Sequence, residues 1–152
     1  MKDRIVVITG ASSGIGLAIA RELALQGAAI VMVCRDQARG EAARQDVAAV
    51  ATGLPPAMFQ ADLLSQRQIR RLAGAINDAY PRIDVLVNNA GAVFARRELT
   101  ADGIEKTFAV NHLAPFLLTN LLLDRIRAAA AGRVITVTSG TYSSALDFDN
   151  LQ

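Results

Sequence analysis

The chain has 152 residues, a formal net charge of +2 and 52% hydrophobic residues, which predicts one domain, 1–152, around a single core. Its arginines are scattered and its apolar runs are short, which argues against a nucleic-acid partner and against a membrane span. No secretory signal precedes the first strand and the single cysteine, Cys34, cannot form an internal disulfide, so we expect a cytoplasmic protein.

A strand, a tight turn and a helix open the chain. Residues 4–8 are apolar and rich in β-branched side chains, which is typical of a strand buried on both faces of a parallel sheet. Apolar residues recur at helical spacing over 15–26, and Gly27 follows as a stop signal. Between strand and helix, residues 9–16 hold three glycines, which permit the chain to reverse tightly.

This glycine turn has the pattern of a phosphate site. The first turn of a helix carries unpaired N–H groups and a partial positive charge, so it holds a pyrophosphate well. We expect Gly10 to make the turn, Gly14 to admit the phosphate, Gly16 to let the helix pack on the strand, and Ser12 and Ser13 to add hydroxyl groups. The alternative is that the three glycines serve only the turn, since their spacing differs from the common dinucleotide motif.

The second predicted strand, 28–34, ends at the position where a dinucleotide-binding protein distinguishes NAD from NADP. An acidic residue there binds the ribose hydroxyls of NAD, whereas an arginine accommodates the 2′-phosphate of NADP. The strand ends in Cys34 and continues with Arg35, which favours NADP. Two alternatives remain: Arg35 is a solvated charge paired to Asp36, or the Asp36 carboxylate reaches the ribose of NAD.

A helix over 37–50 and a strand over 57–61 come next. Asp62 follows that strand at the edge where ligands gather, so it either bonds an adenine amino group or caps a turn. Ser65 and Gln68 have the spacing of a capping box and predict the start of another helix.

Two further strands are predicted, each with a polar end. Residues 83–87 are apolar and lead into Asn88-Asn89-Ala90-Gly91, and residues 133–138 form a strand that Ser139 ends. An Asn- and Gly-rich turn is common by itself. Because parallel strands deliver their carboxyl ends to one edge, we expect this turn and Ser139 to face the same crevice as the glycine turn.

A long helical region is expected to start at Thr100. Pro115 lies inside it and would kink the helix near Asn111, whose side chain, on the sheet side, would need buried partners. His112 is the only histidine and has no cysteine near it in the sequence, so we expect no metal site.

These motifs together resemble those of short-chain dehydrogenases/reductases. The resemblance is carried in order by Thr9-Gly10-x-x-x-Gly14-x-Gly16, Asn88-Asn89-Ala90-Gly91, Asn111 and Ser139. Similarity to the retinol-dehydrogenase-like branch is carried by Cys34-Arg35-Asp36 with Gly40-Glu41-Ala42, by Asp102-Gly103 with Asn111-His112-Leu113, and by Asp147-Phe148-Asp149.

The resemblance implies an α/β Rossmann-type, doubly wound parallel sheet with strand order 3-2-1-4-5. It implies an NADP(H)-dependent oxidoreductase, with NAD(H) as the alternative, that transfers hydride between nicotinamide and an alcohol or carbonyl carbon of a small, apolar substrate. A homo-oligomer is expected at full length.

The resemblance also implies roles for single residues. Ser12 to Gly16 would hold the pyrophosphate, Arg35 the 2′-phosphate, Asp62 and Leu63 the adenine, and Asn89 to Gly91 the ribose, while Thr9 would tie its turn to Asn88. The implied cofactor-binding residues are thus Thr9, Gly10, Ser12, Ser13, Gly14, Ile15, Gly16, Arg35, Asp62, Leu63, Asn89, Ala90 and Gly91. Ser139 would bond the substrate oxygen and Asn111 would hold a water of the proton relay.

The proton donor of the family is a tyrosine in Tyr-x-x-x-Lys, and this sequence departs from that pattern. Tyr142 has Leu146 where lysine is needed, and Tyr80 has Asp84. We expect a chain cut before that motif, without the last strands of the family and inactive alone. The alternative is a non-catalytic nucleotide-binding module or a degenerate family fragment.

Overall fold

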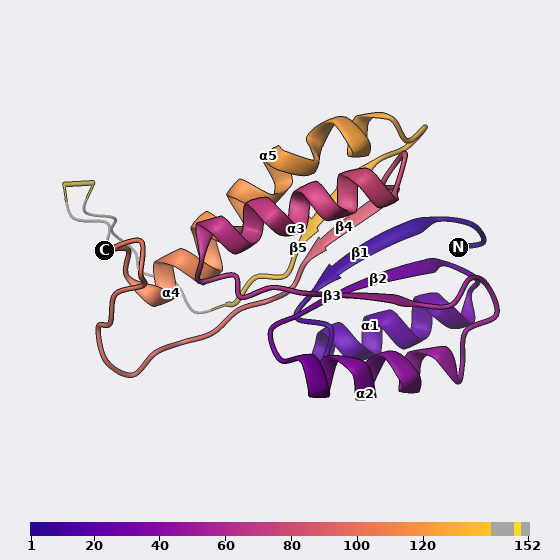
Figure 1. Cartoon of the computed structure of the whole chain (residues 1–152), viewed down its shortest axis with the longest axis horizontal. Coiled ribbons are helices and arrows are strands. Elements are labelled where there is room, and N and C mark those ends of the chain that lie inside the picture. Colours follow the sequence, from indigo (N-terminus) through magenta and orange to yellow (C-terminus); the bar gives the residue numbers. More distant parts are fainter. Residues whose placement is uncertain (141–147, 150–152) are drawn as a thin grey trace.

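The structure, a computed structural model, has three layers, with a parallel sheet between two layers of helices (Figure 1). It describes residues 1–140 and 148–149. Tyr142, Leu146 and Asp147, which the sequence analysis singles out, lie outside the described residues.

The sheet has the predicted order, β3-β2-β1-β4-β5, and all four pairings are parallel. Its strands are β1 (Ile5–Thr9), β2 (Ala29–Cys34), β3 (Ala57–Gln60), β4 (Val85–Asn88) and β5 (Arg133–Thr136). The helices are α1 (Gly14–Leu25), α2 (Gln37–Ala48), α3 (Gln66–Ala79), α4 (Lys106–Phe108), the π-helical turn η1 (Ala109–Leu113) and α5 (Ala114–Arg127).

Two apolar clusters form the core, one on each face of the sheet. Helices α1 and α2 cover one face, and α3 and α5 cover the other (Figure 1). Strands β1 and β2 contribute side chains to both clusters, which explains why their sequences are almost continuously apolar instead of alternating. The chain passes from β1 to β2 and β3 on one side and returns to place β4 on the other. The carboxyl ends of β1 and β4 are therefore the topological switch point, where open α/β sheets bind ligands.

Strand β5 is the edge of the sheet, and its side chains are exposed along their whole length. Ile135 is 49% exposed, and no strand among the described residues pairs with the outer edge. Thr136 ends this strand, so Ser139 lies beyond it and not at its end as predicted. In the described part of the chain, no helix is long and apolar enough to cross a bilayer.

The prediction that a helix starts at Thr100 is wrong. The Thr100 hydroxyl accepts hydrogen bonds from the N–H groups of Asp102 and Ile104, which stabilises a turn instead. The helix begins at Lys106, where the Glu105 side chain caps it and accepts from two N–H groups. Those two bonds hold the pKa of Glu105 below its usual value.

The irregularity expected from Pro115 is present, in the form of the π-helical turn η1 that contains Asn111.

The capping box at Ser65 is half formed. The Ser65 hydroxyl accepts from Gln68 N at 3.4 Å, but the Gln68 side chain accepts from Asp62 N at 3.0 Å and not from Ser65. This second bond fixes the turn between β3 and α3.

A buried carboxylate anchors the amino ends of the strands. Asp84 has only 4% of its side chain exposed and accepts from Ile5 N at 2.9 Å and from Arg4 at 3.1 Å, with Arg82 at 3.3 Å. Burial opposes ionisation of the Asp84 carboxyl, but these hydrogen bonds and the two positive charges outweigh it and lower its pKa. Asp84 therefore links β1 to the segment before β4 at the end of the sheet opposite the switch point.

The Asp84→Asn variant should lose about 2 kcal/mol of unfolding free energy at pH 7, because charge-assisted hydrogen bonds are lost. A carboxylate with a lowered folded-state pKa stabilises above its unfolded pKa, near about 4, and loses that contribution as pH falls through the folded value. Urea denaturation should thus show a constant gap between wild type and variant from pH 7 to 5 that narrows at more acidic pH. Asp78→Asn, on an exposed position of α3, is the control. A stability difference between wild type and Asp84→Asn that stays the same at every pH would contradict a lowered pKa for Asp84.

A second prediction concerns Gly16 at the start of α1. A Cβ atom there would lie 2.4 Å from the carbonyl oxygen of Gly10 and 2.5 Å from Nδ2 of Asn89. Gly16→Ala should therefore cost about 1–3 kcal/mol of stability by overpacking. Gly74→Ala, in α3 with nothing within 4 Å of the new Cβ, should instead stabilise by about 0.5–1 kcal/mol. Equal effects of the two variants in urea denaturation would refute close packing at Gly16.

Candidate functional site

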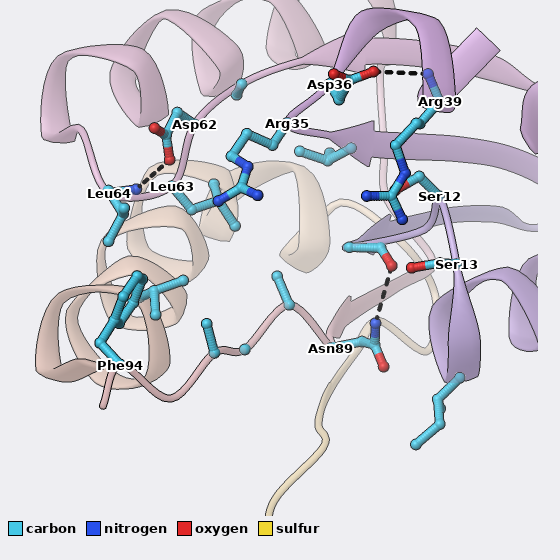
Figure 2. A pocket seen from close by; sticks show the side chains of 18 residues that line it. Ser12, Ser13, Arg35, Asp36, Arg39, Asp62, Leu63, Leu64, Asn89 and Phe94 are labelled. Carbon is cyan, nitrogen blue, oxygen red and sulfur yellow. Dashed lines mark hydrogen bonds between the residues drawn. The ribbon is translucent and has the colours of Figure 1, made fainter. Parts of the chain in front are cut away.

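A cavity of about 410 Å³ opens at the carboxyl ends of the strands (Figure 2). It is lined by the turn after β1, the residues that follow β2 and β3, and the loop after β4. The structure thus brings together segments that are far apart in the sequence. The predicted site residues that line it are Gly10, Ser12, Ser13, Ile15, Arg35, Asp62, Leu63, Asn89, Ala90 and Gly91.

Thr9 joins the turn after β1 to the loop after β4. Its buried hydroxyl accepts from the N–H groups of Asn89 and Ala90, each at 3.0 Å, and donates to the carbonyl of Val87 at 3.4 Å. The prediction that Thr9 binds Asn88 is wrong by one position, because the bonds go to Asn89 and Ala90. Asn88 has another partner. Its side chain turns toward α5 and donates to Thr119 Oγ1 at 3.1 Å.

The Asn89 side chain also joins the two segments, by hydrogen bonds from the loop after β4 to the turn after β1. Its Nδ2 donates to the carbonyl of Thr9 at 2.9 Å and, more weakly, to that of Gly10 at 3.4 Å. The backbone of each segment is therefore held by the other. Asn89 is half-buried and lines the cavity, so it contributes to the shape of the site through the backbone that it fixes.

The amino end of α1 points its first turn at the cavity. Gly14 begins the helix with a φ of 54°, a left-handed angle that glycine adopts easily. Ser13 occupies the cap position, but its side chain makes no capping hydrogen bond, so the N–H groups of the first turn receive nothing from that hydroxyl. Gly14 and Gly16 do not line the cavity themselves; they shape the backbone that does.

Two arginines lie at the β2 end of the cavity. Arg35 follows β2 and Arg39 lies one helical turn later, and both line the cavity with exposed side chains (Figure 2). Neither forms an ion pair with a carboxylate among the described residues. The alternative pairing of Arg35 with Asp36 is not formed, because Asp36 caps α2 and accepts from Arg39 N at 2.8 Å.

Sequence analysis did not identify Arg39. The spacing gives no signal for it, because Arg35 precedes α2, which begins at Gln37, and so shares no helix face with Arg39. Position 39 lies in the first turn of α2, which brings its side chain back toward the strand ends.

Asp62 does what one of its two interpretations predicts. Its Oδ1 accepts from Leu64 N at 3.0 Å and so caps the turn after β3, while the residue also lines the cavity. Leu63 and Leu64 form an apolar wall beside it.

Phe94, which sequence analysis missed, lines the cavity from the loop after β4, and its ring lies 5.5 Å from the Lys106 ammonium group. No local pattern around Phe94 indicates this contact, because Lys106 comes from a separate element.

Asn111 and Ser139 do not line the cavity. Asn111 is exposed, not buried as expected, and its side chain bonds the backbone of Ala92 twice: Oδ1 accepts from Ala92 N at 2.9 Å and Nδ2 donates to Ala92 O at 2.8 Å. The π-helical turn displaces position 111 from the regular helical face, which explains the difference. Ser139 is exposed beyond β5.

Other reactive side chains lie outside the cavity lining. Tyr80 ends α3, and burial raises the pKa of its hydroxyl, which makes it a poorer acid. Burial likewise raises the pKa of the Cys34 thiol, an effect partly offset by hydrogen bonding with Ser12 and Ala11 N. His112 stacks on Phe108 with ring centroids 5.2 Å apart. In the described ranges, no group of three His, Cys, Asp or Glu residues is arranged to hold a metal ion.

Comparisons with known proteins agree with this geometry. The family model described as short chain dehydrogenase matches residues 4–146. The chain is 47% identical over 152 residues to a Streptomyces sp. (strain C5) protein named as a candidate daunorubicin C-13 ketoreductase, DnrU, covering 99% of this chain and 52% of that protein. It is 42% identical over 147 residues to human retinol dehydrogenase 13, covering 96% of this chain and 44% of that one.

A solved structure extends the likeness to three dimensions. A metagenomic short-chain oxidoreductase in complex with NADP superposes with a TM-score of 0.79 and is 34% identical, covering 92% of this chain and 64% of that one. The chain spans about half the length of the curated relatives that it matches. With the parallel sheet and the glycine turn at its switch point, these findings show that the chain belongs to the short-chain dehydrogenase/reductase family, in its retinol-dehydrogenase-like branch.

Proposed function

We propose that the chain binds NADP(H) in the 410 Å³ cavity and that the protein to which it belongs transfers hydride between NADP(H) and an alcohol or carbonyl carbon. The observation that carries the cofactor preference is the pair Arg35 and Arg39, which line the cavity without a carboxylate partner in the described part of the chain. A guanidinium group suits a phosphate because its planar N–H groups match the phosphate oxygens.

The residues present fit a dinucleotide. The glycine turn leaves room for phosphate oxygens beside the backbone, because a Cβ at Gly14 would meet nothing within 4 Å on that side. Ser12, Ser13 and the first turn of α1 supply hydroxyl and N–H donors. Leu63 provides an apolar surface for a base, and the Asp62 carboxylate lies next to it. The bound cofactor would supply or accept the hydride; the chain would supply position and charge.

Asp36 supports the preference for NADP over NAD. A carboxylate that selects NAD accepts hydrogen bonds from the ribose hydroxyls. The Asp36 carboxylate instead accepts from Arg39 N and caps α2. Using it for a ribose would release that cap, so the residue is better suited to hold α2 and, through α2, to hold Arg39 at the cavity. NADP in the metagenomic relative agrees with this choice.

The proposed catalytic roles follow the family resemblance. Ser139 would donate a hydrogen bond to the substrate oxygen, and Asn111 would hold a water for proton transfer. Asn111 would do so while its side chain is bonded to Ala92, which leaves its backbone carbonyl as the acceptor. We propose further a small apolar alcohol or carbonyl substrate, a homo-oligomer at full length and a cytoplasmic location.

A second candidate function is a non-catalytic nucleotide-binding module. It is favoured by one observation: neither tyrosine of the sequence stands in Tyr-x-x-x-Lys. The coding sequence downstream of codon 152 separates the two candidates. An open frame that carries Tyr-x-x-x-Lys supports the oxidoreductase, and its absence supports the module.

The cofactor proposal predicts the effect of Arg35→Ala. Loss of charge-assisted hydrogen bonds should weaken NADPH binding about 10- to 100-fold and leave NADH binding nearly unchanged. Calorimetric titration of the purified chain measures both affinities, and Arg70→Ala, an exposed arginine of α3 outside the cavity, is the matched control. Equal losses for both nucleotides, or a wild-type preference for NADH, would refute the role of Arg35.

The catalytic proposal predicts the effect of Ser139→Ala in the longest protein that the gene encodes. Removing a hydrogen-bond donor to the developing oxyanion should lower kcat about 100-fold or more and leave the Kd for NADPH unchanged. Steady-state reduction of a panel of apolar aldehydes and ketones measures the first, and fluorescence titration with NADPH measures the second. Activity equal to wild type would remove Ser139 from the mechanism without touching the cofactor proposal.

A further inference from the structure

A second, much smaller cavity lies directly behind the wall of the nucleotide cavity. Leu63, Ala90 and Val110 line both of them. The small cavity has a volume of about 10 Å³ and is closed on its other sides by the ends of β1 and β4 and by the start of α5, including Asn88 and Pro115. One water molecule needs roughly 10–15 Å³ of such space.

Asn88 presents an unpaired acceptor at this cavity. The residue is only 6% exposed, and its Nδ2 donates to Thr119 Oγ1 at 3.1 Å. Its Oδ1 is buried and accepts no hydrogen bond from any described residue. A buried amide oxygen without a donor is costly, and buried polar groups of folded proteins are almost always paired, either with protein or with ordered water.

Pro115 leaves a second acceptor in the backbone of η1. In η1, Ala114 N donates to the carbonyl of Ala109, five residues earlier. In the same register, position 115 would donate to the carbonyl of Val110, and in α-helical register to that of Asn111. Proline has no N–H group, so one carbonyl of this turn lacks its donor. Val110 lines the small cavity.

We propose that this cavity is a binding site for one ordered water molecule, which donates one hydrogen bond to Asn88 Oδ1 and the other to the carbonyl freed by Pro115. A water has two donor groups, and the site offers two acceptors. A bound cation of similar size would require more oxygen ligands. Apart from Asn88 and from Thr9, whose hydroxyl is already bonded to Asn89 N, Ala90 N and the carbonyl of Val87, the remaining side chains of the lining are apolar.

Such a water adds a second link between β4 and α5, beside the direct hydrogen bond from Asn88 to Thr119. It joins the end of β4 to the start of α5 just behind Ala90 and Val110, so it supports the wall of the nucleotide cavity from inside. The inference does not depend on which nucleotide binds, because the small cavity is separate from the space that a ligand would fill.

A crystal structure of the chain at about 1.5 Å resolution tests the site directly. We expect a water peak within about 2.6–3.2 Å of the Asn88 side-chain oxygen and of the carbonyl oxygen of Val110. Collapse of the cavity, or a direct hydrogen bond from a protein donor to Asn88 Oδ1, would overturn the proposal.

Two variants of equal size test it in solution. Ala114→Thr brings a hydroxyl to the cavity that replaces the water as a partner of Asn88, whereas Ala114→Val displaces the water and pairs with nothing. We expect the melting temperature of Ala114→Thr to exceed that of Ala114→Val by at least about 4 °C. At Ala20, buried in the apolar cluster under α1, Val should exceed Thr. The same order at Ala114 as at Ala20 would mean an apolar, dry cavity and would refute the water site.

Discussion

The hydroxyl group of Thr9 is the point on which the geometry of the site depends. It accepts hydrogen bonds from Asn89 N and Ala90 N, and the Asn89 side chain donates in return to the carbonyls of Thr9 and Gly10. These bonds close the switch point between β1 and β4, where adjacent strands leave the sheet toward opposite faces. Because Thr9 is 2% exposed, water cannot replace a lost partner. The hydrogen bonds of Thr9 therefore fix the backbone around it. Because Gly10, Asn89 and Ala90 line the cavity, these bonds also fix the shape of the cavity there.

The same contact explains why glycine occupies the turn. The loop after β4 is held so close that a Cβ at Gly10 would lie 2.9 Å from the Cα of Ala90, and a Cβ at Gly16 would lie 2.4 Å from the carbonyl oxygen of Gly10. Gly10 and Gly14 also have φ angles of 66° and 54°, where side chains are disfavoured. A loop packed this tightly cannot also surround its own N–H groups with side chains. Exposed amides at the mouth of the cavity are thus a consequence of the packing, and a phosphate is the ligand that such amides favour.

Periodicity and chain order predicted the sheet because both are properties of short segments. The buried strands are continuous apolar runs, and the motif resemblance supplied their order, which the structure confirms. The failures lie where a side chain chooses between local partners. Thr100 resembles a helix cap, yet its hydroxyl closes a turn of its own and Glu105 caps the helix. Arg39 and Phe94 reach the cavity through the direction of α2 and the path of a loop, and neither is encoded in the spacing of neighbouring residues.

Charge selection at the β2 end follows from a helix cap as much as from an arginine. An Asp at a helix N-terminus stabilises the helix by about 1 kcal/mol through its bond to a first-turn N–H group, and Asp36 makes that bond to the N–H of Arg39. The Asp36 carboxylate is thus engaged with the backbone N–H of Arg39, and the positively charged side chain of Arg39 lines the cavity. A free carboxylate here would repel a 2′-phosphate and attract the arginines, whereas a capped one does neither as strongly. The stability of α2 and the charge presented to a nucleotide are consequently set by one hydrogen bond, so a change that freed Asp36 for a ribose would weaken both together.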